Sequence, residues 1–243
     1  MFRDFAFSFA GPSANEFNRG VLAAVPVMIG FIPFGLLLGT QAVQKGFSVS
    51  ELVLMTGLNF GGGSEFAALS LWTSPPHVLT IVFVSLLVNS RHLLMGASLA
   101  PYLAHLPRRH ALLALFFMCD ESWAMSIADV AKRRQQGLSA FSMAYYAGVA
   151  LSLWLIWIIS TGTGVMVGPM LGDVTMWGFD MAFPAVFLVL LKGMWRGFIP
   201  AIPWLVSLVS AAATYRFCPG AAYVPVGATM GLFTILLMNR KAS

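Results

Sequence analysis

Long apolar runs, separated by short polar stretches, follow one another through most of the chain. A run of about 20 apolar residues is long enough to cross the hydrocarbon core of a bilayer as an α-helix. Within that core every backbone N–H and C=O must be paired inside the protein, so a spanning chain forms helices or a closed barrel. Charged residues make up 9% of the chain and its mean hydropathy is +0.82, whereas a soluble domain carries about 25% charged residues. The sequence therefore predicts an all-α, polytopic integral membrane helical bundle.

The runs indicate seven or eight transmembrane helices in a single transporter domain over residues 1–243, with residues 1–18 as an interfacial segment. The predicted spans are 21–43, 51–72, 78–103, 111–131, 140–165, 174–191, 198–215 and 221–238. The count is seven if the second span is re-entrant, and the fifth span is expected to lose its helix at residues 161–164.

Basic residues favour cytoplasmic loops. With eight spans, this rule places the N-terminus and the cluster Lys132, Arg133 and Arg134 in the cytoplasm. The same topology places Arg108 and Arg109 outside, against the rule.

The second predicted span contains an arrangement that is costly in a bilayer. Asn59 is followed by Gly61, Gly62 and Gly63, and then by Ser64 and Glu65. Each glycine weakens a helix by roughly 1 kcal/mol relative to alanine, and a carboxylate at mid-membrane costs about 2.5–3.5 kcal/mol on insertion scales. Broken backbone at this depth is tolerated only where protein or water covers it. We expect a broken or re-entrant helix that contributes to a polar transport pathway.

Other polar residues also lie inside predicted spans: Asn89, Arg91 and His92 in the third, Asp120 and Glu121 in the fourth, and Asp180 before Pro184 in the sixth. Arg91 needs a partner. Since adjacent helical residues point about 100° apart, either Asp120 or Glu121 can pair with it while the other carries a proton. A structural polar clamp between the two spans is the alternative.

A weak internal repeat is also visible. Gly57-Leu58-Asn59 precedes one broken apolar run, and Gly178-Phe179-Asp180 precedes another about half the chain later. A two-fold repeat would place the binding site at the two interrupted helices, and a chance match of three residues is the alternative.

Several classes of function are disfavoured. The net charge of +5 comes from basic residues that are scattered or lie at span ends, which does not indicate nucleic-acid binding. The two cysteines lack metal-site spacing and no HExxH motif is present, so we expect no metal and no cofactor. The stretch after Gly62 lacks the second glycine of a G-x-S-x-G elbow, and we expect no enzymatic activity.

Five motifs, taken together in their order and spacing, resemble the AzlC family, the large (YgaZ-type) subunits of branched-chain amino acid exporters. The motifs are Phe31-Ile32-Pro33-Phe34-Gly35, Gly63-Ser64-Glu65-Phe66, Asn89 through Gly96, Asp120-Glu121, and Gly178 through Pro184. The resemblance covers about residues 20–240. In one departure, Glu65 stands where the family motif has glutamine.

The resemblance implies secondary, proton-coupled export of L-valine and related branched-chain amino acids, with methionine as a further candidate, across the bacterial inner membrane. It also implies a small AzlD-type (YgaH-like) membrane subunit as partner, with membrane lipids around both. The alternative is a non-transporting membrane scaffold whose buried polar residues serve helix packing and partner binding. The preferred amino acid, the direction and the coupled ion stay open.

A zwitterionic amino acid needs donors for its carboxylate and acceptors for its ammonium. Amides at the helix break and Arg91 are candidates for the first role, and Glu65 or Asp180 for the second. The predicted substrate-binding or proton-coupling residues are Asn59, Gly61, Gly62, Gly63, Ser64, Glu65, Asn89, Arg91, His92, Asp120, Glu121, Asp180 and Pro184.

Overall fold

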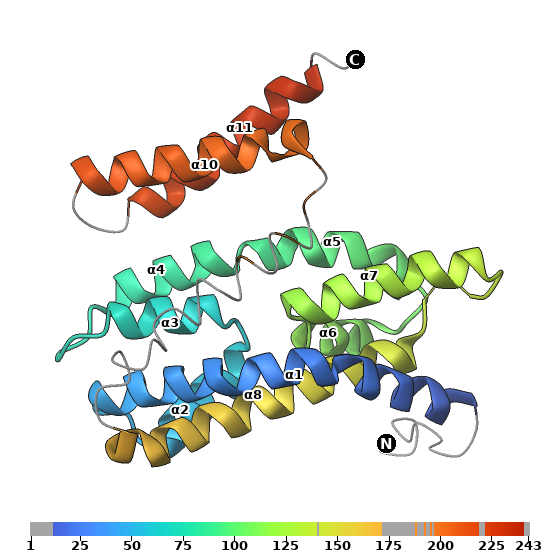
Figure 1. Ribbon diagram of the computed structural model, residues 1–243, viewed down its shortest axis with the longest axis horizontal. Coiled ribbons are helices and arrows are strands. Elements are labelled where there is room, and N and C mark those ends of the chain that lie inside the picture. Colours follow the sequence, from blue (N-terminus) through green and yellow to red (C-terminus); the bar gives the residue numbers. More distant parts are fainter. Residues whose placement is uncertain are drawn as a thin grey trace. The chain divides into compact units, whose positions relative to one another are not determined.

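The computed structural model describes residues 12–139, 141–171, 188, 192, 195, 197–218 and 222–240. The helices are α1 (Pro12–Gln44), α2 (Val49–Asn59), α3 (Gly63–Ser70), α4 (Val78–Asn89), α5 (Arg91–Leu103), α6 (Arg108–Phe116), α7 (Asp120–Gln135), α8 (Met143–Leu171), α10 (Phe198–Phe217) and α11 (Tyr223–Arg240), as shown in Figure 1. The part of the chain that the structure describes is all-helical, in agreement with the predicted fold class.

The chain divides into two compact units, Met1–Phe183 and Pro184–Ser243. In the second unit α10 and α11 lie close together, because a Cβ on Gly227 would be 2.8 Å from Ala211 Cβ and one on Gly231 would be 3.1 Å from Ser207 Cβ. The single transporter domain stays a prediction. The candidate site lies in the first unit.

Helices α1 and α8 form a tightly packed pair along the first unit (Figure 1). A Cβ on Gly39 would lie 2.6 Å from Gly164 Cα, and one on Gly164 would lie 2.9 Å from Gly39 Cα. Towards the other end of the pair, Gly20 faces the backbone of Tyr145 and Gly148 faces that of Phe17. Small residues allow this backbone approach in membrane helices. The predicted end of the fifth span at residues 161–164 is wrong, since α8 continues to Leu171 and Gly164 serves helix packing.

The α2–α3 segment is a re-entrant hairpin. Lys45, before α2, donates from Nζ to Trp72 O, after α3, at 3.3 Å. The rings of Phe47 and Trp72 also lie 4.6 Å apart. The segment therefore enters and leaves at the same end of the unit, as Figure 1 shows. The second predicted span, 51–72, dips in and returns.

The α6–α7 segment is a second hairpin, which enters from the opposite end (Figure 1). The two helices meet at a bend of 117°. Arg134, in the last turn of α7, donates from Nη2 to the hydroxyl of Tyr102, near the end of α5, at 3.3 Å. The prediction of one continuous helix over 111–131 is therefore wrong. The extended backbone of Cys119 (φ −124°, ψ 175°) separates α6 from α7.

This second hairpin also corrects the predicted topology. Arg108 and Arg109 begin α6 and so lie at the same end as Arg134, whereas the eight-span topology put them on opposite sides. In the first unit this end also holds Arg19, which contacts α7. The positive-inside rule then assigns this end to the cytoplasm without the earlier conflict.

Four helical segments of the described chain are long and apolar enough to span a membrane: Ala14–Gln44, Val78–Leu103, Met143–Met170 and Phe198–Phe217. Counting the bent α6–α7 pair as one span gives up to five. The predicted seven or eight spans are not confirmed. The fourth predicted span is the bent α6–α7 pair, and residues 174–187 and 189–191 of the sixth lie outside the described residues.

The hairpin assignment predicts a labelling pattern. In a background with both native cysteines replaced by serine, single cysteines at exposed Ser50 and Thr73 should react with an impermeant maleimide from the same side of the membrane. Cysteines at His105 and Gln136 should both react from the opposite side. Labelling of intact cells against inverted vesicles measures this, and opposite sides for Ser50 and Thr73 would mean that α2–α3 crosses.

The α1–α8 contact predicts an asymmetric response to added methyl groups. Gly39→Ala should lower the free energy of unfolding by about 1–3 kcal/mol, because the new methyl overlaps the facing backbone. Gly30→Ala on the same helix is the control, since a Cβ there meets nothing within 4 Å. Thermal unfolding in detergent measures both, and equal melting temperatures would refute the tight contact.

Candidate functional site

The two helices of the first hairpin meet at a break with two positive φ angles. Phe60 caps α2 in the left-handed conformation, with φ 45° and ψ 40°. A bulky residue rarely adopts that conformation, but Phe60 is only 4% exposed and packs in the core. Gly62, just before α3, has φ 54° and ψ −86°, a combination that needs a residue without Cβ. The glycine run thus makes a sharp turn inside the unit.

Glu65, in the first turn of α3, holds this turn together. Its Oε1 accepts from Gly61 N at 3.1 Å and from Asn59 Nδ2 at 3.3 Å. Its Oε2 accepts from the indole Nε1 of Trp157 on α8 at 2.9 Å, and the residue is 1% exposed. A charge at membrane depth is penalised, and three donors around one carboxylate offset that penalty.

Amide side chains extend the network to the neighbouring helix. Asn59 also donates from Nδ2 to Ser64 Oγ at 2.8 Å. Asn89, at the end of α4, donates from Nδ2 to Asn59 Oδ1 at 2.9 Å. A Cβ on Gly61 would lie 2.7 Å from Asn59 Nδ2 and 2.8 Å from Asn89 Oδ1, so the site requires glycine there.

Arg91, the first residue of α5, joins the two hairpins. Its Nη2 donates to Gly61 O in the first break at 2.9 Å. Its Nη1 pairs with Asp120 Oδ2, at the start of α7 in the second break, at 3.0 Å. The sequence left the partner of Arg91 open between Asp120 and Glu121, and the structure pairs it with Asp120.

Two buried polar atoms of this network have no hydrogen-bond partner within the described part of the chain: Asn89 Oδ1 and Arg91 Nε. One is an acceptor and the other a donor. Buried polar atoms without partners are uncommon and cost free energy. A small molecule or water with both a donor and an acceptor would satisfy them.

The remaining predicted residues are distributed around this core. His92 has its Nδ1 3.1 Å from Asn89 O. Glu121 is partly buried next to Asp120, and Gly63 begins α3. Asp180 and Pro184 lie outside the described residues, so their site roles and the proposed repeat stay predictions.

The sequence interpretation missed an aromatic wall beside Glu65. Trp157 is 2% exposed, and its ring lies 5.6 Å from both Phe31 and Phe34. Phe34 stacks on Phe66 at 4.6 Å. A buried indole N–H usually has a partner, so a tryptophan in the middle of an apolar span was a usable signal.

Comparison with known proteins places the chain in a family. The family model described as AzlC protein matches residues 26–171. The Escherichia coli K12 "Inner membrane protein YgaZ" is 26% identical over 226 residues, covering 92% of this chain and 85% of the relative. The Bacillus subtilis 168 "Branched-chain amino acid transport protein AzlC" is 26% identical over 218 residues, covering 89% and 82%.

An "Uncharacterized membrane protein" of Archaeoglobus fulgidus is 28% identical over 184 residues, covering 74% of this chain and 77% of the relative. No solved structure matches. The family match takes in both hairpins and the network around Arg91. Because it also covers more than half of the chain, this integral membrane protein belongs to the AzlC family.

Proposed function

We propose that this protein is the large subunit of a proton-coupled, secondary-active exporter of branched-chain L-amino acids across the bacterial inner membrane. Valine is the expected substrate and methionine a further candidate. One observation supports this most directly: Arg91 connects the breaks of the two hairpins, where Arg91 Nε and Asn89 Oδ1 have no partner among the described residues. The substrate class follows the name of the Bacillus subtilis relative.

The polar groups suit a zwitterion. Arg91 Nε and the first amides of α3, those of Gly63 and Ser64, would donate to the carboxylate, since the first N–H groups of a helix have no carbonyl partner in a preceding turn. Asn89 Oδ1 and Asp120 would accept from the ammonium. Transporters commonly bind substrates at such interrupted helices.

The aromatic wall of Phe31, Phe34, Phe66 and Trp157 would face the apolar side chain of the substrate. Such a wall discriminates by roughly 1–3 kcal/mol per methylene, which favours valine over alanine but separates valine from isoleucine only modestly. We assign proton coupling to Glu65, so the coupling residue would differ from that of relatives whose motif has glutamine at this position. Glu121, in the shared Asp120-Glu121 motif, is the second candidate. The small AzlD-type subunit stays an expected partner.

Counterflow in proteoliposomes tests the proposal. Vesicles loaded with unlabelled valine should accumulate labelled valine, and an imposed pH gradient should change the rate. Unlabelled lysine in place of valine should give no accumulation. If the protein catalyses no counterflow, alone or with the small partner, the scaffold alternative replaces the transporter.

Replacing Glu65 tests the coupling role. Glu65→Gln should preserve the fold and valine counterflow at equal pH but abolish the response to a pH gradient, because glutamine cannot carry a proton. Glu51→Gln is the matched control: Glu51 is an exposed acid of the same hairpin, and glutamine keeps the capping box with Ser48. An unchanged pH response in Glu65→Gln would remove Glu65 from the coupling mechanism.

The bond from Trp157 to Glu65 predicts an interaction between two substitutions. Glu65→Gln alone should lower the free energy of unfolding by about 1–3 kcal/mol. Glutamine has one side-chain oxygen, so it cannot accept both from Gly61 and Asn59 and from Trp157. Trp157→Phe removes one of these donors, so the double variant should lose less than the sum of the single variants. Trp154 donates to Gly57 O instead. The losses in free energy of unfolding caused by Trp154→Phe and by Glu65→Gln should therefore add in the double variant.

A further inference from the structure

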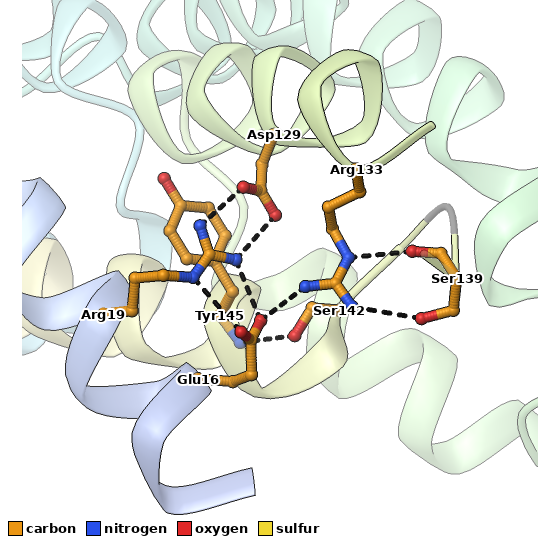
Figure 2. A network of polar contacts seen from close by, with 7 residues as sticks. All are labelled: Glu16, Arg19, Asp129, Arg133, Ser139, Ser142 and Tyr145. Carbon is orange, nitrogen blue, oxygen red and sulfur yellow. Dashed lines mark hydrogen bonds and ion pairs between the residues drawn. The ribbon is translucent and has the colours of Figure 1, made fainter. Parts of the chain in front are cut away.

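A second charged network lies at the opposite end of α7 from Asp120 (Figure 2). Arg19 on α1 donates from Nη1 and Nη2 to the two carboxylate oxygens of Asp129 on α7, at 2.6 and 3.0 Å. Asp129 is 6% exposed. Such a bidentate arginine–carboxylate pair fixes both distance and orientation.

Glu16 links this pair to a second arginine. It accepts from Arg19 Nη2 at 2.8 Å and from Arg133 Nη1 at 2.7 Å. Arg133 also donates from Nε to Ser139 O at 2.8 Å, and the Arg19 guanidinium lies 4.1 Å from the centre of the Tyr145 ring. We call Glu16, Arg19, Asp129 and Arg133 the charge cluster; its two acids and two bases alternate, as Figure 2 shows.

The charge cluster holds α7 against α1 in a different way from the α1–α8 contact. Helices α1 and α8 meet backbone to backbone at glycines such as Gly20 and Gly148, a contact that cannot open without losing close packing. Arg19 and Asp129 instead reach across with side chains whose charges water can solvate when they separate. The net free energy of such a pair is small compared with its direct attraction, so this contact suits reversible opening.

On its α8 side the α6–α7 hairpin is held by apolar packing. Ala114 and Met118 belong to one buried cluster with Tyr146 and Ala150 of α8, and the Tyr146 hydroxyl donates to Ala114 O. An open pocket of about 340 Å³, lined mainly by apolar side chains, lies beside this contact. The ion pairs of the charge cluster hold the hairpin on its α1 side.

We propose that the charge cluster is a latch at the cytoplasmic end, which closes the α6–α7 hairpin over the site and positions Asp120 against Arg91. This rests on the transport function proposed above. Asp129 lies on the same helix as Asp120, roughly 13–14 Å further along at ~1.5 Å per residue. Release of Asp129 from Arg19 lets α7 swing away from α1, which withdraws Asp120 from Arg91 and opens the break to the cytoplasm.

Native Cys119, 7% exposed at the break between α6 and α7, reports the opening. In a Cys218→Ser background Cys119 is the only cysteine, and its alkylation by N-ethylmaleimide is measured in membranes. Asp129→Asn should speed alkylation about fivefold or more, whereas Asp129→Glu, which keeps a carboxylate for Arg19, should stay close to the parent rate. Lys132→Gln, which removes an exposed charge from the same helix end, should leave the rate unchanged.

A merely structural role gives a different result. If Asp129→Asn lowers the melting temperature but leaves Cys119 alkylation at the parent rate, or if Asp129→Glu speeds alkylation as much as Asp129→Asn does, the latch is refuted. The alkylation assay needs no substrate. A latch that responds as expected in a protein without valine counterflow would therefore refute the proposed substrate and leave the latch standing.

Discussion

A single guanidinium connects the breaks of the two hairpins of the first unit. Arg91 donates to Gly61 O in one break and pairs with Asp120 in the other. In hydrocarbon neither a bare carbonyl nor an isolated charge is stable, so each break makes the other tolerable. This mutual dependence explains why the polar residues gather in one place although they come from helices far apart in the sequence.

The other helices of the first unit are held together by different kinds of contact. Helices α1 and α8 pack through glycines, and α8 also supplies Trp157 to the carboxylate of Glu65. The α2–α3 hairpin is thereby fastened to a close-packed scaffold. The α6–α7 hairpin packs on α8 through the apolar cluster around Tyr146, and is also held by Arg91 at its break and by Arg19 at its end. The two hairpins therefore differ in that charged contacts take a larger part in holding the second.

The cost of burying polar groups also explains which features could be predicted from the sequence. The cost of burying polar groups in a bilayer does not depend on topology, so Glu65, Arg91 and Asp120 could be identified before the course of the chain was known. Hydropathy reports only that a segment is apolar, and a re-entrant hairpin is as apolar as a crossing helix. The prediction of one crossing helix over 111–131 failed for this reason. Trp157 was missed because its role depends on an indole N–H meeting a carboxylate 92 positions away in the chain.

The order of elements within the first unit has a direct consequence for transport. A full-length helix followed by a re-entrant hairpin occurs twice, first as α1 with α2–α3 and then as α4–α5 with α6–α7, and the hairpins enter from opposite ends (Figure 1). Each hairpin thus separates Arg91 from one side of the membrane. Under the proposed transport function, moving one hairpin while the other stays would expose the same polar groups to one side only, which is the geometric requirement of alternating access. Two oppositely directed hairpins would meet that requirement without any rearrangement of the α1–α8 scaffold.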